Sequence, residues 1–191
     1  VSLQVTTTSL PIPLLAPPNL TYDGSAKSYI VSQNAYLSAG RDHALVLKAD
    51  GTVVSFGWFR FGQKYPPTAL GPLTGISTGN DHTLALKADG TVIAWGHNTY
   101  GQTSVPNGLT GVVAVQAGDA LSVALKSDKT VVAWGSYSSA MPTGLTGVEK
   151  IAASARHVLA LKSNGTVVAW GDNTHGQCNV PGSLTNVTAI A

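Results

Sequence analysis

Short apolar runs alternate with polar pairs along most of the chain, and the same succession of runs recurs four times. Each copy opens with a segment such as Val112–Ala117 or Glu149–Ala153 and continues with two more apolar runs. Runs of about four to eight residues rich in Val, Ile, Leu and Ala, bounded by Gly, Asp and Asn, are typical of β-strands. No stretch sustains an apolar period of about 3.6 residues, so the pattern predicts an all-β chain with almost no helix.

The second and third runs of each copy predict a β-hairpin. The predicted strand pairs are Ala44–Leu47 with Thr52–Phe56, Thr83–Leu86 with Thr91–Trp95, Ser122–Leu125 with Thr130–Trp134, and Val158–Leu161 with Thr166–Trp170. The residues between them are Asp50-Gly51, Asp89-Gly90, Asp128-Lys129 and Asn164-Gly165. Gly in such a turn supplies the positive φ angle that a tight hairpin needs. Lys129 fits this position poorly, so the third copy departs furthest from the common pattern.

The copies have a period of about 39 residues, within the range typical of repeat architectures. The equivalent positions are Gly40, Gly79, Gly118 and Ser154, spaced 39, 39 and 36 residues apart. The last interval is short because SYSSAMP lacks three residues that the corresponding stretch HNTYGQTSVP contains. In repeat proteins each sheet buries its open face against the next one. We therefore predict that residues 36–191 form four β-propeller blades of three to four short antiparallel strands each.

The presence of four blades does not determine whether they form a complete ring. A propeller is stable because every blade packs between two neighbours. The chain is therefore part of a longer array, a partial ring that a second copy completes by self-association, or a smaller closed ring.

Residues 1–35 do not share the repeat. Four prolines, at positions 11, 13, 17 and 18, predict an extended N-terminal segment or linker. The following stretch, LTYDGSAKSYIV, predicts a strand, a turn and a strand. It resembles a phrase found in immunoglobulin-like modules of bacterial surface proteins, so this segment is interpreted as a remnant of such a module.

Charge and cysteine content narrow the classes of partner. The chain has 11 Lys and Arg residues and 9 Asp and Glu residues, with no run of either sign. This balance argues against a nucleic-acid partner. No apolar stretch approaches the length of a transmembrane helix, so membrane insertion is not expected. Cys178 is the only cysteine, which excludes an intrachain disulfide and a cysteine-based zinc site.

Two sets of repeated side chains are interpreted as structural. Three histidines, His43, His82 and His157, recur at one position of the repeat, on separate blades. We expect them to hydrogen-bond neighbouring loops and not to converge on a metal ion. Large aromatic residues, Phe56, Trp95, Trp134 and Trp170, end the third strand of each copy. We expect them to fill the wedge between blades, while exposure on the ring face, as binding anchors, is the alternative.

The connectors after each hairpin carry the candidate partner-binding residues, because aromatic residues and Arg dominate interface energies. These candidates are Trp58, Phe59, Arg60, Phe61, Tyr65, Tyr100, Tyr137 and His175. Trp58 and Phe59 replace polar residues of the other copies, and capping of the first blade by the Pro-rich segment is an equal alternative for this pair. No catalytic motif is present, so neither an enzyme nor a cofactor is expected.

The stretches ALKADGTVIAWGHNTYGQTSVP and ALKSNGTVVAWGDNTHGQCNVP combine an apolar Leu strand, an Asp-Gly-like turn, Trp-Gly and Asn-x-x-Gly-Gln. This combination resembles the regulator-of-chromosome-condensation repeat superfamily, and its short period is similar to the compact bacterial branch of type II β-lactamase inhibitory proteins. The resemblance covers residues 36–191 and implies a ring of seven blades. It also implies a bacterial protein that is extracellular or on the cell surface.

The leading functional hypothesis is a non-enzymatic protein-interaction or adhesion module of the bacterial cell envelope, which binds its partner through loops on one propeller face. One alternative is an inhibitor of a secreted enzyme such as a β-lactamase. Another is a carbohydrate-binding module for surface glycans. Guanine-nucleotide exchange and chromatin binding, which occur elsewhere in the superfamily, are not expected without a basic patch.

Overall fold

The computed structural model describes residues 37–191 except 49, 50, 58, 59, 64 and 69. The chain divides into two units, residues 1–31 and 32–191. All described residues belong to the second unit, so the predicted Pro-rich linker and the strand-turn-strand segment lie outside them. None of the described residues belongs to a helix long and apolar enough to span a bilayer.

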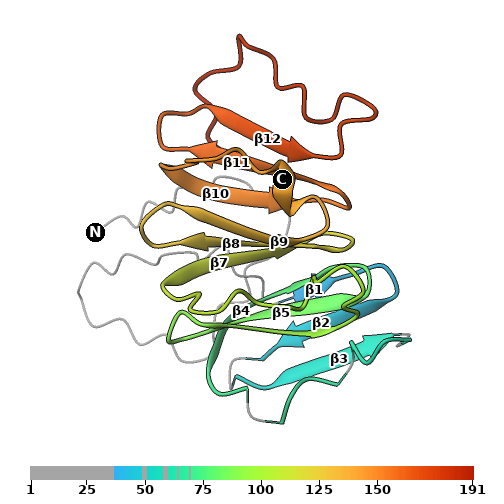
Figure 1. Ribbon diagram of the computed structural model, residues 1–191. Coiled ribbons are helices and arrows are strands. Elements are labelled where there is room, and N and C mark those ends of the chain that lie inside the picture. Colours follow the sequence, from blue (N-terminus) through green and yellow to red (C-terminus); the bar gives the residue numbers. More distant parts are fainter. Residues whose placement is uncertain (1–36, 49–50, 58–59, 64, 69) are drawn as a thin grey trace, which may run out of the picture. The chain divides into compact units, whose positions relative to one another are not determined.

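The second unit contains four antiparallel sheets of three strands, each built from consecutive strands (Figure 1). Their strands are β1 (Leu37–Ala39), β2 (His43–Leu47) and β3 (Val53–Gly57); β4 (Leu73–Thr78), β5 (His82–Lys87) and β6 (Val92–Gly96); β7 (Val112–Ala117), β8 (Leu121–Lys126) and β9 (Val131–Gly135); and β10 (Val148–Ala153), β11 (His157–Lys162) and β12 (Val167–Gly171). The helical content of the described residues is a single 3-10 turn, η1 (Ser138–Ala140). The predicted all-β class and the blade-like hairpins are confirmed. No described strand of the first sheet pairs with one of the fourth.

The hairpin turns adopt the backbone that their sequence predicts. Gly51, Gly90 and Gly165 have φ angles of 80°, 77° and 76°, and Lys129 takes the same conformation at 65°. A side chain in this left-handed region normally costs about 1 kcal/mol. The register of β8 and β9 pairs Leu125 with Val131, and the Lys126 N–H donates to the Thr130 carbonyl, so the turn between the strands has three residues, 127–129, and forces Lys129 into this conformation.

Replacing Lys129 with Gly is therefore expected to stabilise the protein by about 0.5–1 kcal/mol, because the backbone strain disappears. The gain is limited by loss of the exposed Lys129–Glu149 ion pair. Gly51→Lys is the reciprocal variant: a Cβ atom there meets nothing within 4 Å, so the expected loss of about 1 kcal/mol comes from the backbone alone. Urea unfolding of both variants measures the two effects.

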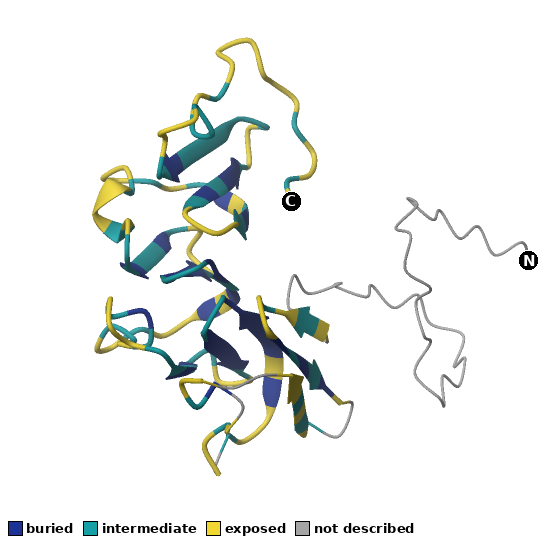
Figure 2. Cartoon of the chain, turned by 90° about the vertical axis from the view of Figure 1, so that its right-hand side faces the viewer, coloured by how far each residue is buried: buried dark blue, intermediate teal, exposed yellow. Residues whose placement is uncertain are grey.

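Successive sheets pack face to face, and the buried residues lie between them (Figure 2). Strand β4 contacts β1 and β2, β7 contacts β4 and β5, and β10 contacts β7 and β8. We call the packed region between two successive sheets a joint. In the first joint, Leu45 and Leu47 of the first sheet pack with Ile76 and Trp95 of the second, and the second and third joints repeat this arrangement. Between successive sheets the apolar side of one hairpin is thus buried by its neighbour, as the repeat pattern predicts.

A polar network joins the second and third sheets. His82, fully buried, lies with its Nε2 atom 3.0 Å from the Ser122 hydroxyl, and Ser122 donates to the Gln102 carbonyl at 2.7 Å. Because Ser122 uses its only proton on Gln102, His82 donates from Nε2. The Trp134 indole N–H also donates to the Gln102 carbonyl, at 2.9 Å. The first joint has the same design, with the Trp95 indole donating to the Gln63 carbonyl at 2.8 Å.

The third joint has lost this network and become apolar. Leu121 stands at the position of His82, Val158 stands at that of Ser122, and the shortened connector has no counterpart of Gln102. Leu121 and Val158 are both fully buried in the core between the third and fourth sheets. The Trp170 indole N–H remains buried there without a partner among the described residues.

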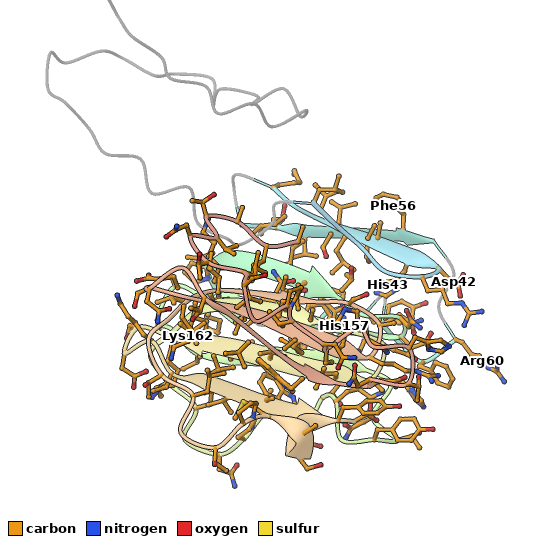
Figure 3. The ribbon with its side chains drawn as sticks, turned by 90° about the horizontal axis from the view of Figure 1, so that it is seen from above. Asp42, His43, Phe56, Arg60, His157 and Lys162 are labelled. Carbon is orange, nitrogen blue, oxygen red and sulfur yellow. The ribbon has the colours of Figure 1, made fainter. Side chains whose placement is uncertain are left out.

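The aromatic side chain at the end of the third strand of each sheet is buried in three sheets and exposed in the first. Trp95, Trp134 and Trp170 have 7%, 6% and 3% of their surface exposed, whereas Phe56 has 54%. Phe56 therefore departs from the predicted wedge packing, because its face of the first sheet has no preceding sheet among the described residues. Figure 3 shows Phe56 on this outer face.

Candidate partner-binding surface

One end of every hairpin carries the long connectors. The third strands end at Gly57, Gly96, Gly135 and Gly171, which have φ angles between 87° and 116°. A Cβ atom on Gly96 would lie 2.5 Å from the Asp81 carbonyl oxygen, so only glycine lets the strand leave the sheet at this point. Asp42 and Arg60 lie at this end in Figure 3, and Lys162 lies at the other end, near the tight turns. We call the connector end of the sheets the connector face.

A buried glutamine in the first and second connectors holds one variable side chain outward. The side chains of Gln63 and Gln102 accept hydrogen bonds from the backbone N–H of Phe61 and Tyr100, at 2.8 and 2.9 Å. Both glutamines are almost fully buried, while Phe61 and Tyr100 are exposed by 38% and 62%. The residue before each Gly-Gln pair is therefore a display position whose backbone is fixed and whose side chain is free to vary.

The fourth connector uses the same display position. The Gln177 side chain accepts from the His175 N–H at 2.9 Å, and His175 is exposed. The third connector lacks the Gly-Gln pair, and Tyr137 adopts a left-handed conformation with φ of 59° before η1. Tyr137 is 39% exposed, so this connector also presents an aromatic ring by a different backbone route.

The first two connectors bring their aromatic residues together. The Phe61 ring stacks on the His97 ring with centroids 4.2 Å apart, and Tyr100 meets His97 edge-on at 6.4 Å. The guanidinium group of Arg60 lies 5.5 Å from the centre of the Phe61 ring. These four residues, Arg60, Phe61, His97 and Tyr100, form what we call the aromatic cluster of the connector face. Pairs of this kind stabilise one another by about 0.5–1.5 kcal/mol each.

Hydrogen bonds fix the His97 ring inside this cluster. The Gln102 amide nitrogen lies 3.2 Å from His97 Nδ1, and the Thr99 hydroxyl lies 2.7 Å from Nε2. Because Gln102 already uses its amide oxygen on Tyr100, its NH₂ group donates and His97 Nδ1 accepts. The cluster therefore has one defined arrangement, which lowers the entropic cost of binding a partner.

The sequence predicted only some of the residues of this surface. Of the predicted residues, the structure brings together Arg60, Phe61 and Tyr100, and it leaves Tyr65 70% exposed. Trp58 and Phe59 lie outside the described residues. His97 was missed, although its place directly after Trp95-Gly96, in the same connector as Tyr100, was a usable signal.

The described residues contain no group of three His, Cys, Asp or Glu side chains that could hold a metal ion. His43 and His82 are buried between sheets, and His157 is half-buried on the fourth sheet. Burial raises the pKa of the Cys178 thiol, which donates to the Asp172 carbonyl at 3.3 Å. A raised thiol pKa opposes nucleophilic reactivity, so Cys178 acts as a loop-bracing group.

Comparison with known proteins agrees with this geometry. The Regulator of chromosome condensation (RCC1) repeat family matches residues 35–63, 74–102 and 148–177. The chain therefore contains three RCC1-type repeats. The third sheet is the unmatched one, in keeping with its lost His, its Lys129 turn and its short connector. No curated protein matches the chain.

Solved structures with similar folds support the RCC1-type architecture. Yeast RCC1 (Prp20), solved bound to Kap60, is 20% identical, with a TM-score of 0.66 over 84% of this chain and 49% of that one. The ectodomain of the Physcomitrella patens receptor kinase CR4 is 23% identical, with a TM-score of 0.61 over 80% and 44%. Human WBSCR16 is 22% identical, with a TM-score of 0.59 over 71% and 46%. The chain thus spans about half the length of these relatives, and the likeness concerns the fold.

Proposed function

We propose that this RCC1-type chain is a non-enzymatic protein-interaction module that binds its partner through the connector face. The observation that carries the proposal is the aromatic cluster, in which exposed rings from two neighbouring blades are held in a defined arrangement. Aromatic residues and Arg are the types that supply most interface energy when a partner desolvates them. Phe61 and Tyr100 combine such chemistry with backbones fixed by buried glutamines.

Relatives of similar fold bind proteins. Yeast RCC1 (Prp20) has been solved bound to Kap60, and the structure of Prp20p was described with its binding to Gsp1p and histones. These partners belong to those proteins, and fold likeness does not transfer them. They support the narrower point that a propeller of this repeat can serve as a binding scaffold.

The proposal includes an extracellular or cell-surface location in a bacterium. Its support is the resemblance of the short repeat to the compact bacterial branch, together with the use of a similar fold in the ectodomain of CR4. Protease treatment of intact cells of the source organism should remove the protein from the surface. Full protection of the protein until the cells are lysed would contradict this location.

Combined Phe61→Ala and Tyr100→Ala substitution is expected to lower capture of the partner from cell-surface extract by at least about tenfold, since two exposed rings that the partner would cover are lost. The captured proteins are compared by quantitative mass spectrometry. Phe56→Ala is the matched control, because it removes an exposed ring on the outer face of the first sheet and leaves the connector face intact. Equal capture by all three chains would contradict the proposed surface. Capture that survives digestion of the extract with protease would instead indicate a glycan partner.

A further inference from the structure

The chain has two Asn-Gly pairs, Asn107-Gly108 and Asn164-Gly165. In such a pair the backbone nitrogen of Gly can attack the side-chain amide carbon of Asn, because Gly has no Cβ atom to keep the two groups apart. Both asparagines are exposed to solvent. Exposure alone therefore does not distinguish the two pairs, and the difference between them lies in their hydrogen bonds.

The hairpin turn between β11 and β12 holds Asn164-Gly165 in an unreactive arrangement. The Thr166 N–H and hydroxyl donate to Asn164 Oδ1 at 3.1 and 2.7 Å, which fixes the Asn side chain. The Gly165 N–H donates to the Lys162 carbonyl at 2.9 Å, so the attacking nitrogen is already engaged. Reaction at Asn164 first requires this turn to open, and the turn closes a hairpin that is paired along its whole length.

The Asn107-Gly108 pair lies in an open turn of the connector between β6 and β7. The hydrogen bond of this turn runs from the Leu109 N–H to the Pro106 carbonyl, at 3.2 Å, and involves neither residue of the pair. Within the described part of the chain, neither the Asn107 side chain nor the Gly108 N–H makes a hydrogen bond. Gly108 has a φ of 75°, and a Cβ atom placed on it would meet nothing within 4 Å. The two reacting groups can therefore approach each other with little loss of structure.

The reactive pair belongs to the second connector alone. The residues that correspond to Asn107 in the other connectors are Thr68, Thr143 and Gly182. Val105 and Leu109, on either side of the pair, are partly buried and pack against the core of the second joint. These two contacts hold the connector in place while the turn between them rearranges, so reaction at Asn107 does not require the sheets to separate.

We propose that Asn107 is a site of spontaneous deamidation in the folded protein, whereas the hairpin turn protects Asn164. The Gly108 nitrogen bonds to Cγ of Asn107, and the Cγ–Nδ2 bond breaks. The proton of the Gly108 nitrogen leaves with the amide nitrogen as ammonia. Water then hydrolyses the cyclic imide at either carbonyl carbon and gives aspartate or isoaspartate. The reaction consumes one molecule of water and needs neither an oxidant nor a reductant.

Either product changes the second connector. The new carboxylate lowers the formal net charge of the chain from +2 to +1. Isoaspartate also lengthens the main chain between Val105 and Leu109 by one carbon atom, because the chain then runs through the former side-chain carbonyl. The modified chain therefore differs from the unmodified chain in charge and in the chromatographic retention of one peptide.

The test compares the two asparagines within one molecule. The folded chain is incubated at mildly alkaline pH in heavy-oxygen water, which labels the carboxylates that form, and is then digested with trypsin. Cleavage after Lys126 places Asn107 and Asn164 in separate peptides for mass spectrometry. We expect conversion in the folded chain to be at least about tenfold faster at Asn107 than at Asn164. In urea, where the hairpin turn is lost, the two rates should become similar. Equal rates in the folded chain would overturn the proposal.

The Asn107→Thr variant checks which residue of the peptide reacts. Thr143 occupies the equivalent position of the third connector, so the fold accommodates threonine there. The tryptic peptide that contains Asn107 also contains Asn98, and we expect the variant peptide to remain unlabelled. Label that persists in Asn107→Thr would come from Asn98 and would overturn the assignment.

The Thr166→Val variant tests the protection of Asn164. It removes the hydroxyl donor to Asn164 Oδ1 and keeps the branched shape of the side chain. Conversion at Asn164 should become about threefold faster or more, with the rate at Asn107 unchanged. An unchanged rate at Asn164 in this variant would contradict protection by the turn.

Discussion

Lowering the pH from 7.5 to 4.5 is expected to reduce the free energy of unfolding by about 2–3 kcal/mol through His82 alone. Burial of the ring between the second and third sheets, reinforced by the nearby His43, lowers the pKa of His82 from 6.5 to about 4. In the unfolded chain the same ring has its ordinary pKa. Between these two values the unfolded state binds more protons than the folded state, so stability falls as the pH decreases through this window.

The His82→Leu variant isolates this contribution. Leu121 occupies the same position in the third sheet, so the fold already accommodates leucine there. Ser122 keeps its bond to the Gln102 carbonyl in the variant, which avoids leaving that hydroxyl unpaired. Urea unfolding at several pH values, followed by tryptophan fluorescence, should show a flatter pH profile for His82→Leu between pH 6.5 and 4. Parallel profiles for the two chains would show that His82 does not titrate as its burial predicts.

His43 is expected to add to the acid sensitivity of the unmodified chain in the same direction. Burial lowers its pKa, and the carboxylates of Asp81 and Asp42 oppose this shift. The pKa of Asp128 is lowered to about 2 by hydrogen bonds from Lys126 and Thr130. Its contribution is present above the ordinary carboxyl pKa and is lost only as the pH falls toward 2, below the His82 window. The difference between the parent and His82→Leu therefore reports on the histidine.

Trp95→Phe is expected to cost about 2 kcal/mol more than Trp170→Phe, although both changes remove the same atoms from almost fully buried positions. The Trp95 indole N–H donates to the Gln63 carbonyl, and its removal leaves that acceptor without this bond. The Trp170 N–H has no partner among the described residues, so its removal relieves an unpaired donor.

Trp134→Phe provides the internal control for this comparison. The Gln102 carbonyl accepts from both Trp134 and Ser122, so it keeps one donor when the indole is lost. The expected order of destabilisation is therefore Trp95, then Trp134, then Trp170. Urea unfolding followed by far-UV circular dichroism measures all three variants without relying on the mutated fluorophore. Equal losses in the three variants would show that ring volume, and not the hydrogen bond, controls this position.

Residue types alone predicted some members of the candidate binding surface. Aromatic residues in polar connectors were sufficient to select Phe61 and Tyr100, because such residues are unusual in exposed loops and common in interfaces. The stack through His97 could not be predicted, since it joins connectors of two different blades. The sequence also did not show that the side chains of Gln63 and Gln102 hold the backbone of Phe61 and Tyr100. A recurring Gly-Gln pair is equally consistent with a solvated turn.

The sequence by itself determined the strands, the turns and their fourfold repetition, because alternating apolar residues and Gly at positive φ act over a few neighbouring residues. Only the tertiary structure decided which equivalent positions are buried. Phe56 and Trp95 occupy the same place in their hairpins, yet one is exposed and the other covered, since burial depends on whether a neighbouring sheet is present. The left-handed turn at Lys129 has the same origin: strand register and packing outweigh a local conformational cost of about 1 kcal/mol.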